Sequence, residues 1–318
     1  MKILVTGAAG FIASHVADAY VGAGNEVVIL DDLSRGAKRN VNPKARFYQC
    51  DIRDREAVES IFLAEKPGIV NHHAAQMDVR RGVREPHFDA QVNILGSLNV
   101  IESAVAHGAR RFIYAATAGA GYGEPKQIPV PENYPINPIT PYGISKHTVE
   151  HYLFTFQFLY GLQYVVLRYG NVYGPRQSSR GEAGVFAIFS EQMLSGIQPA
   201  IYGDGQKVRD YVFVSDVVRA NVAALANGTN EIFNIGSGVA TKDFEIFEQV
   251  RNLLGKTEIQ PQYVPRRPGE IDRISLDISK AARLLDWAPQ VPLDEGAQRT
   301  VRYFQDAALA SSAASNAK

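Results

Sequence analysis

A short apolar run, a glycine-containing turn and a helical pattern follow one another directly at the start of the chain. The run is Ile3–Val5, the turn is Gly7-Ala8-Ala9-Gly10-Phe11-Ile12-Ala13, and the helical pattern covers residues 11–22. The first glycine permits a tight turn, and the second lets backbone amides approach a pyrophosphate at the helix N-terminus. Alanine replaces the usual third glycine and is still small enough for close packing. A plain structural turn is the alternative, but the order of the elements favours a dinucleotide site with contacts at Gly7, Gly10, Phe11 and Ile12.

Strands and helices alternate through the first half of the chain. Buried strands are predicted at Ile3–Val5, Val27–Leu30, Phe47–Cys50, Gly68–Asn71, Arg111–Ala115 and Tyr164–Arg168, and helices at about 11–22, 54–65, 88–107 and 142–160. This alternation predicts an α/β fold, with a doubly wound parallel sheet, right-handed crossovers and helices on both faces. Ligands of such sheets bind at the carboxyl ends of the strands.

The second half is less regular, because glycine and proline break it into short segments after Gly170. A helix near 214–227, a strand near 231–235 and a Pro/Arg-rich stretch at 261–269 follow. We predict a smaller, partly interleaved C-terminal substrate lobe. The expected division is 1–170 for the cofactor domain with 207–230 returning to it, 171–206 and 231–305 for the lobe, and 306–318 for a disordered Ala/Ser-rich tail.

Composition narrows the classes of partner. The 33 basic and 33 acidic residues balance, and the sequence pI is about 7.1, so no global charge attracts nucleic acid or an anionic membrane. The single cysteine, Cys50, excludes an intrachain disulfide and a zinc site of several thiolates. The adjacent pair His72-His73 points to opposite faces of a strand, so we expect no metal there. No long apolar run or signal peptide is visible, and we expect a cytoplasmic protein.

Two acidic positions follow the second and third strands. Asp31 stands where a carboxylate accepts hydrogen bonds from both ribose hydroxyls, and its charge repels a 2′-phosphate. NAD is therefore preferred to NADP, although Arg35 and Arg39 lie near enough in sequence to serve a phosphate. A turn-forming role is the alternative for Asp31. Asp51 and Ile52 resemble a contact to the adenine edge, with a helix N-cap as the alternative for the aspartate.

Tyr142 and Lys146 are candidates for the chemistry. Their spacing places both side chains on one face of a helix that begins near Pro141. Lowering a tyrosine pKa from about 10 to near neutrality requires about 4 kcal/mol of preference for the phenolate. One cation at about 4 Å supplies an energy of that order, at an effective dielectric near 20. Lys146 and an oxidised nicotinamide are both suitable cations. Thr117, two residues beyond a predicted strand, faces the same cleft and can hold a substrate proton, unless it only satisfies loop backbone.

These motifs together resemble an extended short-chain dehydrogenase/reductase. The glycine turn, Ala74-Ala75-Gln76 after the fourth strand, Thr117, Tyr142 and Lys146 carry the resemblance over about residues 1–305. Within that family the chain is most similar to the UDP-glucose 4-epimerases. The resemblance implies a modified Rossmann domain, a tightly held NAD and a homodimer built through a four-helix bundle. It also implies cofactor contacts at Ala74, Ala75 and Gln76, and at Asn93 beside the nicotinamide.

The resemblance assigns further contacts in the second half. Asn171 matches an asparagine near the substrate diphosphate, and Arg209 and Arg267 match two arginines that bind it. Arginine suits this role because its planar fork binds phosphate oxygens in pairs; surface salt bridges are the alternative. Glu270, in the same motif as Arg267, is a substrate contact, and Tyr169 is a cofactor contact.

Neighbours of Thr117 separate the related reactions. Sugar-nucleotide 4,6-dehydratases have an Asp-Glu pair directly after the threonine, and uronate decarboxylases a nearby glutamate, whereas this chain has Ala118 and Gly119. We therefore predict interconversion of UDP-glucose and UDP-galactose through a 4-ketopyranose, without a metal. A UDP-glucuronate 4-epimerase, with Arg176 or Arg180 near the carboxylate, is the runner-up, and a non-catalytic NAD-binding scaffold is a further alternative. Met77 replaces a lysine of some epimerases. Pocket volume near Ile274 decides whether N-acetylated sugars fit.

Overall fold

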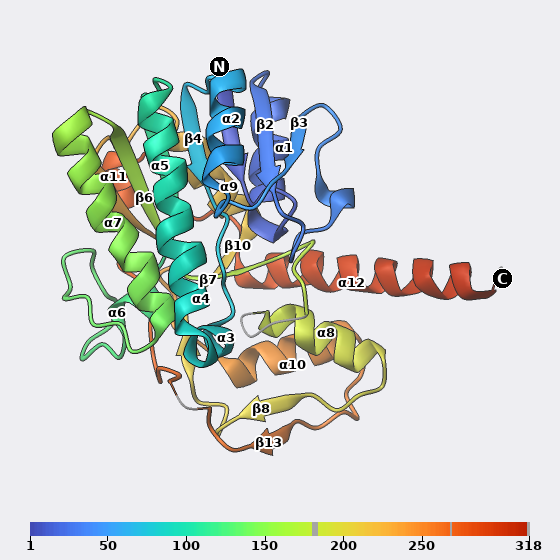
Figure 1. Ribbon diagram of the computed structural model, residues 1–318. Helices are drawn as coiled ribbons and strands as arrows, with labels where there is room; N and C mark the ends of the chain where they lie inside the picture. Colours follow the sequence, from blue (N-terminus) through green and yellow to red (C-terminus); the bar gives the residue numbers. More distant parts are fainter. Residues whose placement is uncertain (180–183, 268, 317–318) are drawn as a thin grey trace.

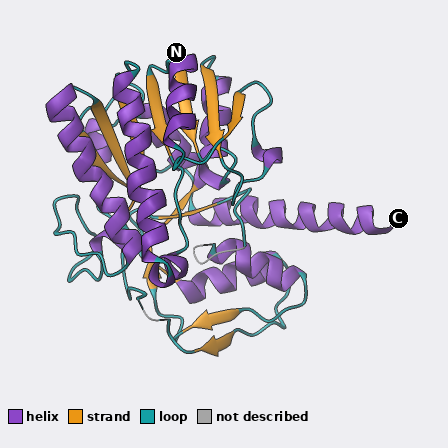
Figure 2. Ribbon diagram, in the orientation of Figure 1, coloured by secondary structure: helices purple, strands orange, loops and turns teal. Residues whose placement is uncertain are grey.

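A seven-stranded parallel sheet forms the centre of the first domain. The computed structural model describes residues 1–179, 184–267 and 269–316. The strand order is β11-β6-β5-β4-β1-β2-β3, with every neighbouring pair parallel (Figures 1 and 2). The strands are β1 (Lys2–Thr6), β2 (Glu26–Asp31), β3 (Arg46–Gln49), β4 (Ile69–His72), β5 (Arg111–Thr117), β6 (Gln163–Tyr169) and β11 (Glu231–Ile235). The predicted doubly wound Rossmann fold is confirmed.

Helices cover both faces of this sheet. One layer contains α2 (Arg55–Glu65), α5 (Ser97–Ala106) and α7 (Pro141–Tyr160), and the other contains α1 (Phe11–Gly22), α9 (Val214–Ala223) and α11 (Ser279–Leu284). The strands are buried on both sides, as their nearly continuous apolar sequences predict. Ile3, Leu4 and Val5 of β1 are fully buried. Burial of each such side chain stabilises the fold by about 1.5–3 kcal/mol.

The second lobe lies beside the carboxyl ends of the strands, in the lower part of Figure 1. Its aromatic core is formed between α8, α10 and α12, around Phe186, Phe189 and Phe247. The elements are β7 (Asn171–Tyr173), α8 (Val185–Leu194), β8 (Ala200–Tyr202), β9 (Val208–Arg209), β10 (Tyr211–Phe213), β12 (Thr241–Lys242), α10 (Asp243–Leu253), β13 (Gln262–Val264) and α12 (Leu293–Asn316). They pair as three small sheets, β10-β7, β12-β9 and β13-β8.

Two boundaries differ from the sequence-based division. The segment that returns to the first domain extends beyond residue 230, because β11 pairs with β6 along its whole length. Ala281, Leu285 and Trp287 also lie in the core of the first domain, although we assigned 231–305 to the lobe. The last helix, α12, continues to Asn316, where we expected a disordered tail, and it projects from the body in Figure 1. Alanine has the highest helix propensity, which accounts for this continuation.

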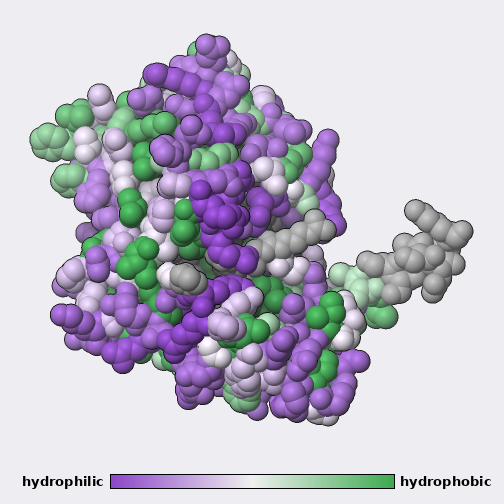
Figure 3. Space-filling model, turned by 60° about the horizontal axis from the view of Figure 1, so that its bottom comes forward, coloured by the Kyte–Doolittle hydropathy of each residue, from purple (hydrophilic) through white to green (hydrophobic). Residues whose placement is uncertain are grey.

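The surface carries no sign of a membrane segment in the ranges described above: no helix there is long and apolar enough to cross a bilayer. Figure 3 shows the face with the second lobe turned forward. Hydrophilic residues cover most of it, and hydrophobic residues gather only in small groups.

Candidate active site

The glycine turn between β1 and α1 contacts the segment after β4. Gly7 has φ +72°, and a Cβ at this position would lie 2.8 Å from the backbone nitrogen of Ala74. A Cβ on Gly10 would lie 3.0 Å from the Gly7 carbonyl oxygen. Both glycines are therefore needed for the backbone to turn here, and Phe11 and Ile12 begin α1 directly behind them. This cradle fits the pyrophosphate of a dinucleotide.

Gly7→Ala is expected to weaken NAD binding at least tenfold, because the new methyl group pushes the turn away from Ala74. Gly24→Ala is the matched control, since Gly24 has a similar φ of +79° and an added Cβ meets nothing within 4 Å. The control should lose about 1 kcal/mol of stability from the left-handed backbone alone and keep its NAD affinity. Calorimetric titration with NAD measures both. Equal affinities in the two variants would contradict the role of this contact.

Asp31 lies at the carboxyl end of β2 and is 6% exposed. Its carboxylate accepts hydrogen bonds from the backbone nitrogens of Ala9 at 2.9 Å and Leu33 at 2.8 Å. Burial raises the pKa of Asp31, and these two hydrogen bonds lower it in part. Each carboxylate oxygen keeps a lone pair for a further donor, as ribose hydroxyls require. The geometry therefore fits the predicted ribose contact.

The affinity for NAD is expected to fall as the pH falls through the pKa of Asp31. The ionised carboxylate accepts both ribose hydroxyls, so the contact is fully present above that pKa and is lost below it. Because burial raises the pKa, the loss begins at a higher pH than for an ordinary aspartate. Uptake of one proton by Asp31 lowers the affinity for NAD by about tenfold for each pH unit below that pKa. Asp31→Asn should bind NAD more weakly at neutral pH and lose this dependence; an unchanged pH profile in that variant would assign it to another group.

Asp51 and Ile52 follow β3. Asp51 is held by Arg53, with the Nε and Nη2 atoms 2.9 and 2.5 Å from Oδ2, and this contact lowers the pKa of Asp51. The N-cap of α2 is Asp54, so Asp51 does not have the capping role that was the alternative. Ile52 is buried against the backbone of Gly96, where a Cβ would lie 2.7 Å from the isoleucine Cγ1. The adenine contact stays a prediction.

Asn93 fixes the backbone of Gln76. Its Oδ1 accepts from the Gln76 nitrogen at 2.8 Å, and its Nδ2 donates to the Gln76 carbonyl at 3.0 Å. Asn93 lies in a π-helical segment, η2 (Gln91–Gly96), between α4 (Pro86–Ala90) and α5, although the sequence predicts one regular helix over 88–107. Single π-helical turns are frequent at functional sites. Ala74 is held from the other side, because its backbone nitrogen donates to the Thr6 hydroxyl at 3.1 Å.

The first turn of α7 carries Tyr142 to Thr117. Thr140 caps this helix by accepting from the Gly143 nitrogen at 3.2 Å, and Pro141 occupies the first helical turn. Thr117 is the last residue of β5, and its hydroxyl interacts with the phenol of Tyr142. Lys146, one turn further along α7, lies with Nζ 4.2 Å from the centroid of the Tyr114 ring. The predicted side chains are thus together at the carboxyl end of the sheet.

Burial disfavours the charged forms of both Tyr142 and Lys146. Burial raises the pKa of Tyr142 to about 12, the charge of Asp89 adds to this, and the Thr117 hydrogen bond lowers it. Burial lowers the pKa of Lys146 to about 7, against the charges of Glu150 and Asp89. The expectation that Lys146 lowers the pKa of Tyr142 stays a prediction. An oxidised nicotinamide would add a second positive charge that favours the phenolate.

Tyr169 is the last residue of β6, at the carboxyl end of the sheet. Its hydroxyl accepts from the Asn221 amide at 2.8 Å and lies 3.1 Å from Nε2 of His73. His73 and His72 use opposite faces of β4: Nδ1 of His72 lies 2.7 Å from the Thr6 hydroxyl. The structured segments hold no cluster of three or more metal-ligating side chains.

Three predicted substrate residues come together on the second lobe. Arg209 donates to the carbonyls of Val208 at 2.9 Å and Ile271 at 2.8 Å, so its guanidinium is fixed beside the segment that carries Arg267 and Glu270. The Arg267 guanidinium lies 3.4 Å from the centroid of the Tyr202 ring. Glu270 lies 3.8 Å from Nη1 of Arg267.

Lys207, which we did not predict, donates to Glu270 at 2.6 Å. This buried lysine fixes the glutamate beside the two arginines. Asn171 begins β7, and its backbone nitrogen donates to the Asp210 carbonyl at 2.6 Å. Arg209, Arg267 and Lys207 give this part of the lobe positive charge suited to a diphosphate.

The NAD-dependent epimerase/dehydratase family matches residues 3–236. The chain belongs to this family. UDP-glucose 4-epimerase of Mycolicibacterium smegmatis is 42% identical over 313 residues, which cover 96% of this chain and 99% of the relative. A crystal structure of the Thermotoga maritima UDP-glucose 4-epimerase with UDP-glucose matches with a TM-score of 0.95 and 48% identity, over 97% of this chain and 100% of that one. The Thermus thermophilus UDP-glucose 4-epimerase in complex with NAD matches with a TM-score of 0.92 and 41% identity, over 96% and 100%. The predicted family and its NAD cofactor are confirmed.

From the sequence we named three further residues of this family member, which are Arg176, Arg180 and Met77. Arg176 is bound to α1, with Nη1 3.1 Å from the Ser14 hydroxyl and 2.8 Å from Asp18. Arg180 lies outside the described residues. Met77 contacts Arg35, with the sulfur 3.8 Å from Nη2.

Small and apolar residues follow Thr117 and pack against the segment around Ile274. Ile274 is buried, and a Cβ added to Gly119 would lie 3.9 Å from its Cγ2. Ala118 belongs to the same apolar cluster as Ile274.

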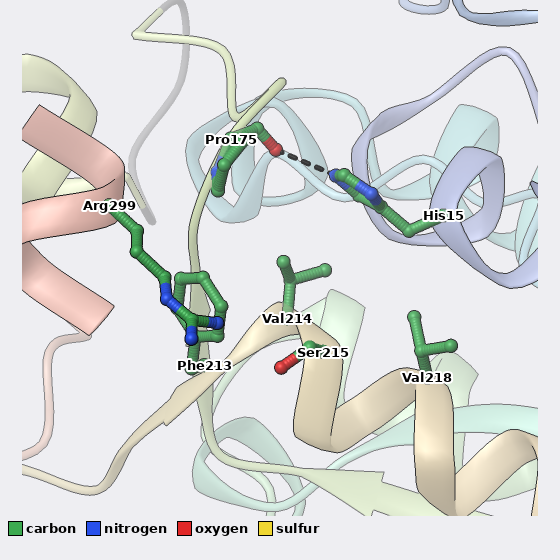
Figure 4. Close-up of a pocket in the computed structure, with 7 residues that line it drawn as sticks. All are labelled: His15, Pro175, Phe213, Val214, Ser215, Val218 and Arg299. Atoms are coloured by element: carbon green, nitrogen blue, oxygen red, sulfur yellow. Dashed lines mark hydrogen bonds between the residues drawn. The ribbon is translucent and has the colours of Figure 1, made fainter. Parts of the chain in front are cut away.

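A separate pocket of about 320 Å³ lies between α1, the start of α9 and α12 (Figure 4). Its residues are His15, Pro175, Phe213, Val214, Ser215, Val218 and Arg299. Arg299 pairs with Glu295 and lies over the Phe213 ring at 5.7 Å, and His15 lies 2.9 Å from the Pro175 carbonyl oxygen. None of the predicted site residues lines this pocket, so we assign it no part in the reaction.

Proposed function

We propose that this protein is an NAD-dependent 4-epimerase that interconverts UDP-glucose and UDP-galactose. One observation carries the proposal: Tyr142 meets Thr117 at the sheet edge, where Ala118 and Gly119 replace the acidic pair needed for elimination of water. Tyr142 is then the general base of the site. The sugar and the uridine are supported by the UDP-glucose 4-epimerases that match nearly the whole chain.

In the proposed reaction, NAD held by Gly7, Gly10 and Asp31 would accept a hydride from C4 of the sugar and would return it to C4 after the sugar has turned. Tyr142 takes the proton of the 4-hydroxyl, and Thr117 holds that hydroxyl in place. Lys146 contributes positive charge beside the phenolate. The resulting 4-ketopyranose turns about its bond to the diphosphate and presents its other face, after which Tyr142 returns the proton. The turn inverts C4.

This cycle requires a firmly held diphosphate and a loosely held sugar. Arg209, Arg267 and Asn171 serve the diphosphate, and Glu270 orients Arg267. Ala118 and Gly119, directly after Thr117, give the sugar a surface without hydrogen-bonding side chains. Such a surface permits rotation of the intermediate, because a hydrogen-bonded sugar would lose its contacts on turning.

Conversion of UDP-galactose to UDP-glucose tests the proposal. The purified protein is incubated with UDP-galactose, with and without added NAD, and the products are separated by chromatography. Approach to a mixture of the two sugars supports the proposal. Conversion of UDP-glucuronate alone would favour the runner-up, a UDP-glucuronate 4-epimerase. Absence of any conversion, and of absorbance near 340 nm with every nucleotide sugar tried, would favour a scaffold.

The active unit is a homodimer formed through α7 and the neighbouring α5. Phe154 and Phe158 of α7 are 60% and 77% exposed, and Leu95 of η2, at the start of α5, is 56% exposed. An apolar helix face of this kind is typical of a protein interface. The proposal includes a cytoplasmic location, which agrees with the balanced charge and single cysteine.

Phe158→Asp is expected to give a monomer in analytical ultracentrifugation, because the charge would be buried in the bundle. Ile197→Asp is the control, since Ile197 is 54% exposed and follows α8 in the second lobe, away from α5 and α7. The control should stay dimeric. A dimeric Phe158→Asp protein would contradict the proposed interface.

A further inference from the structure

Asp89 of α4 is a buried carboxylate beside the catalytic helix. It is 1% exposed. Its Oδ1 accepts from the Ser145 hydroxyl at 2.6 Å, and its Oδ2 accepts from the Gln76 amide at 3.0 Å. Ser145 directly precedes Lys146 and lies three residues after Tyr142, so this contact reaches the middle of the catalytic turn.

The surrounding structure is built to hold this carboxylate. A Cβ on Gly82, in α3 (Val79–Arg84), would lie 2.9 Å from Oδ2 of Asp89, so only glycine leaves room there. Asn93 donates to the Ser145 hydroxyl at 3.1 Å and also holds the backbone of Gln76. Asp89 thus joins α4, η2, α7 and the segment after β4 into one hydrogen-bonded network.

The hydrogen-bond partners of Asp89 are neutral, whereas the other buried carboxylate near Lys146 is paired. Glu150 of α7 accepts from Arg168 of β6 at 3.0 and 2.6 Å. A buried negative charge is costly unless a positive charge lies close to it. Lys146 is the cation on which the charge of Asp89 acts.

We propose that Asp89 is a positioning residue that sets the charge balance of the Tyr142–Lys146 pair, an inference that rests on the epimerase function proposed above. It holds α7 through Ser145 and places a negative charge beside the catalytic pair. Removal of that charge makes both catalytic groups easier to deprotonate.

Several titratable groups face Tyr142 and Lys146 from the elements packed around them. They are Glu150 on α7, His72 at the end of β4 and His73 directly after it, Tyr114 on β5 and Asp89 on α4. Burial keeps the two histidines neutral, since it lowers the pKa of both, to about 3 for His73. The charge of Asp89 raises the pKa of Tyr142 and also that of Lys146. Asp89 is therefore the group whose charge raises the pKa of both Tyr142 and Lys146.

The pH profile of kcat for Asp89→Asn tests the proposal in the NAD-loaded enzyme. The limb that reports Tyr142 should move to lower pH by about one unit, because the phenol loses its proton more readily once the negative charge of Asp89 is gone. Ser145→Ala should lower kcat without moving this limb, because it removes the hydrogen bond and keeps the charge. Glu102→Gln, an exposed carboxylate on α5, should change neither. If Asp89→Asn does not fold, Asp89→Ser replaces it.

A second measurement does not depend on turnover. Carbon NMR of protein labelled in the tyrosine rings identifies Tyr142 as the resonance missing in Tyr142→Phe. In the NAD-loaded Asp89→Asn protein this resonance should titrate about one pH unit lower than in the wild type. An unmoved limb and an unmoved resonance, with only a lower rate, would overturn the proposal. An inactive wild type would reject the epimerase function, and the resonance would still decide the role of Asp89.

Discussion

Tyr142→Phe is expected to lower kcat for epimerisation by about a thousandfold, within the range that a general acid–base contributes. The phenol is buried and meets Thr117, and phenylalanine keeps its ring while removing the atom that carries the proton. Binding of NAD and UDP should change little, because the residues proposed for them lie elsewhere. Steady-state kinetics gives kcat, and calorimetric titration gives the two affinities.

Tyr152→Phe provides the control for this experiment. Tyr152 lies on the same helix and is 36% exposed, so its hydroxyl faces solvent and not the site. This variant should keep the wild-type kcat. A Tyr142→Phe enzyme with activity near that of the wild type would mean that another group is the base, with Thr117 the next candidate.

Gly143→Ala is expected to reduce the free energy of unfolding by about 3 kcal/mol and kcat by about a hundredfold. A Cβ on Gly143 would lie 2.1 Å from the carbonyl oxygen of Ala120, in the short helix α6 (Gly119–Tyr122). The clash is with backbone, so α7 must move away from the segment that follows Thr117. Urea denaturation measures the loss of stability, and kinetics measures the displacement of Tyr142.

Gly121→Ala is matched to this substitution. Gly121 is buried in the same contact region, but a Cβ there meets nothing within 4 Å. Its stability should change by less than about 1 kcal/mol, with kcat near that of the wild type. Equal effects of the two substitutions would show that the close approach of α6 and α7 does not position the tyrosine.

Local sequence patterns were sufficient to predict most strands of the first domain and the helices between them. The strand, glycine turn and helix at residues 3–22 predict α1 because the apolar spacing, the turn and the helix start lie within one short segment. The same holds for Tyr142 and Lys146, whose spacing on one helix fixes their common face. These features need no knowledge of distant residues.

Features that depend on distant residues could not be predicted in this way. The pairing of β11 with β6 depends on a crossover that the sequence does not specify, so the domain boundary at 231 was placed too early. No local pattern singles out Asp89, because its partner Ser145 is 56 residues away. Lys207 and Glu270 meet across 63 residues. The π-helical turn at Asn93 leaves no distinct spacing pattern in the sequence.

The fate of a deuterium at C4 of UDP-galactose tests the central claim most directly. Oxidation and reduction at C4 by one bound cofactor return the same hydrogen to the same carbon, so the UDP-glucose formed should carry the deuterium at C4. Mass spectrometry and proton NMR of the product locate the label. Deuterium retained at C4 is the result that this account predicts. Loss of the label to water would contradict the account, because it would require proton exchange at C4 in place of hydride transfer.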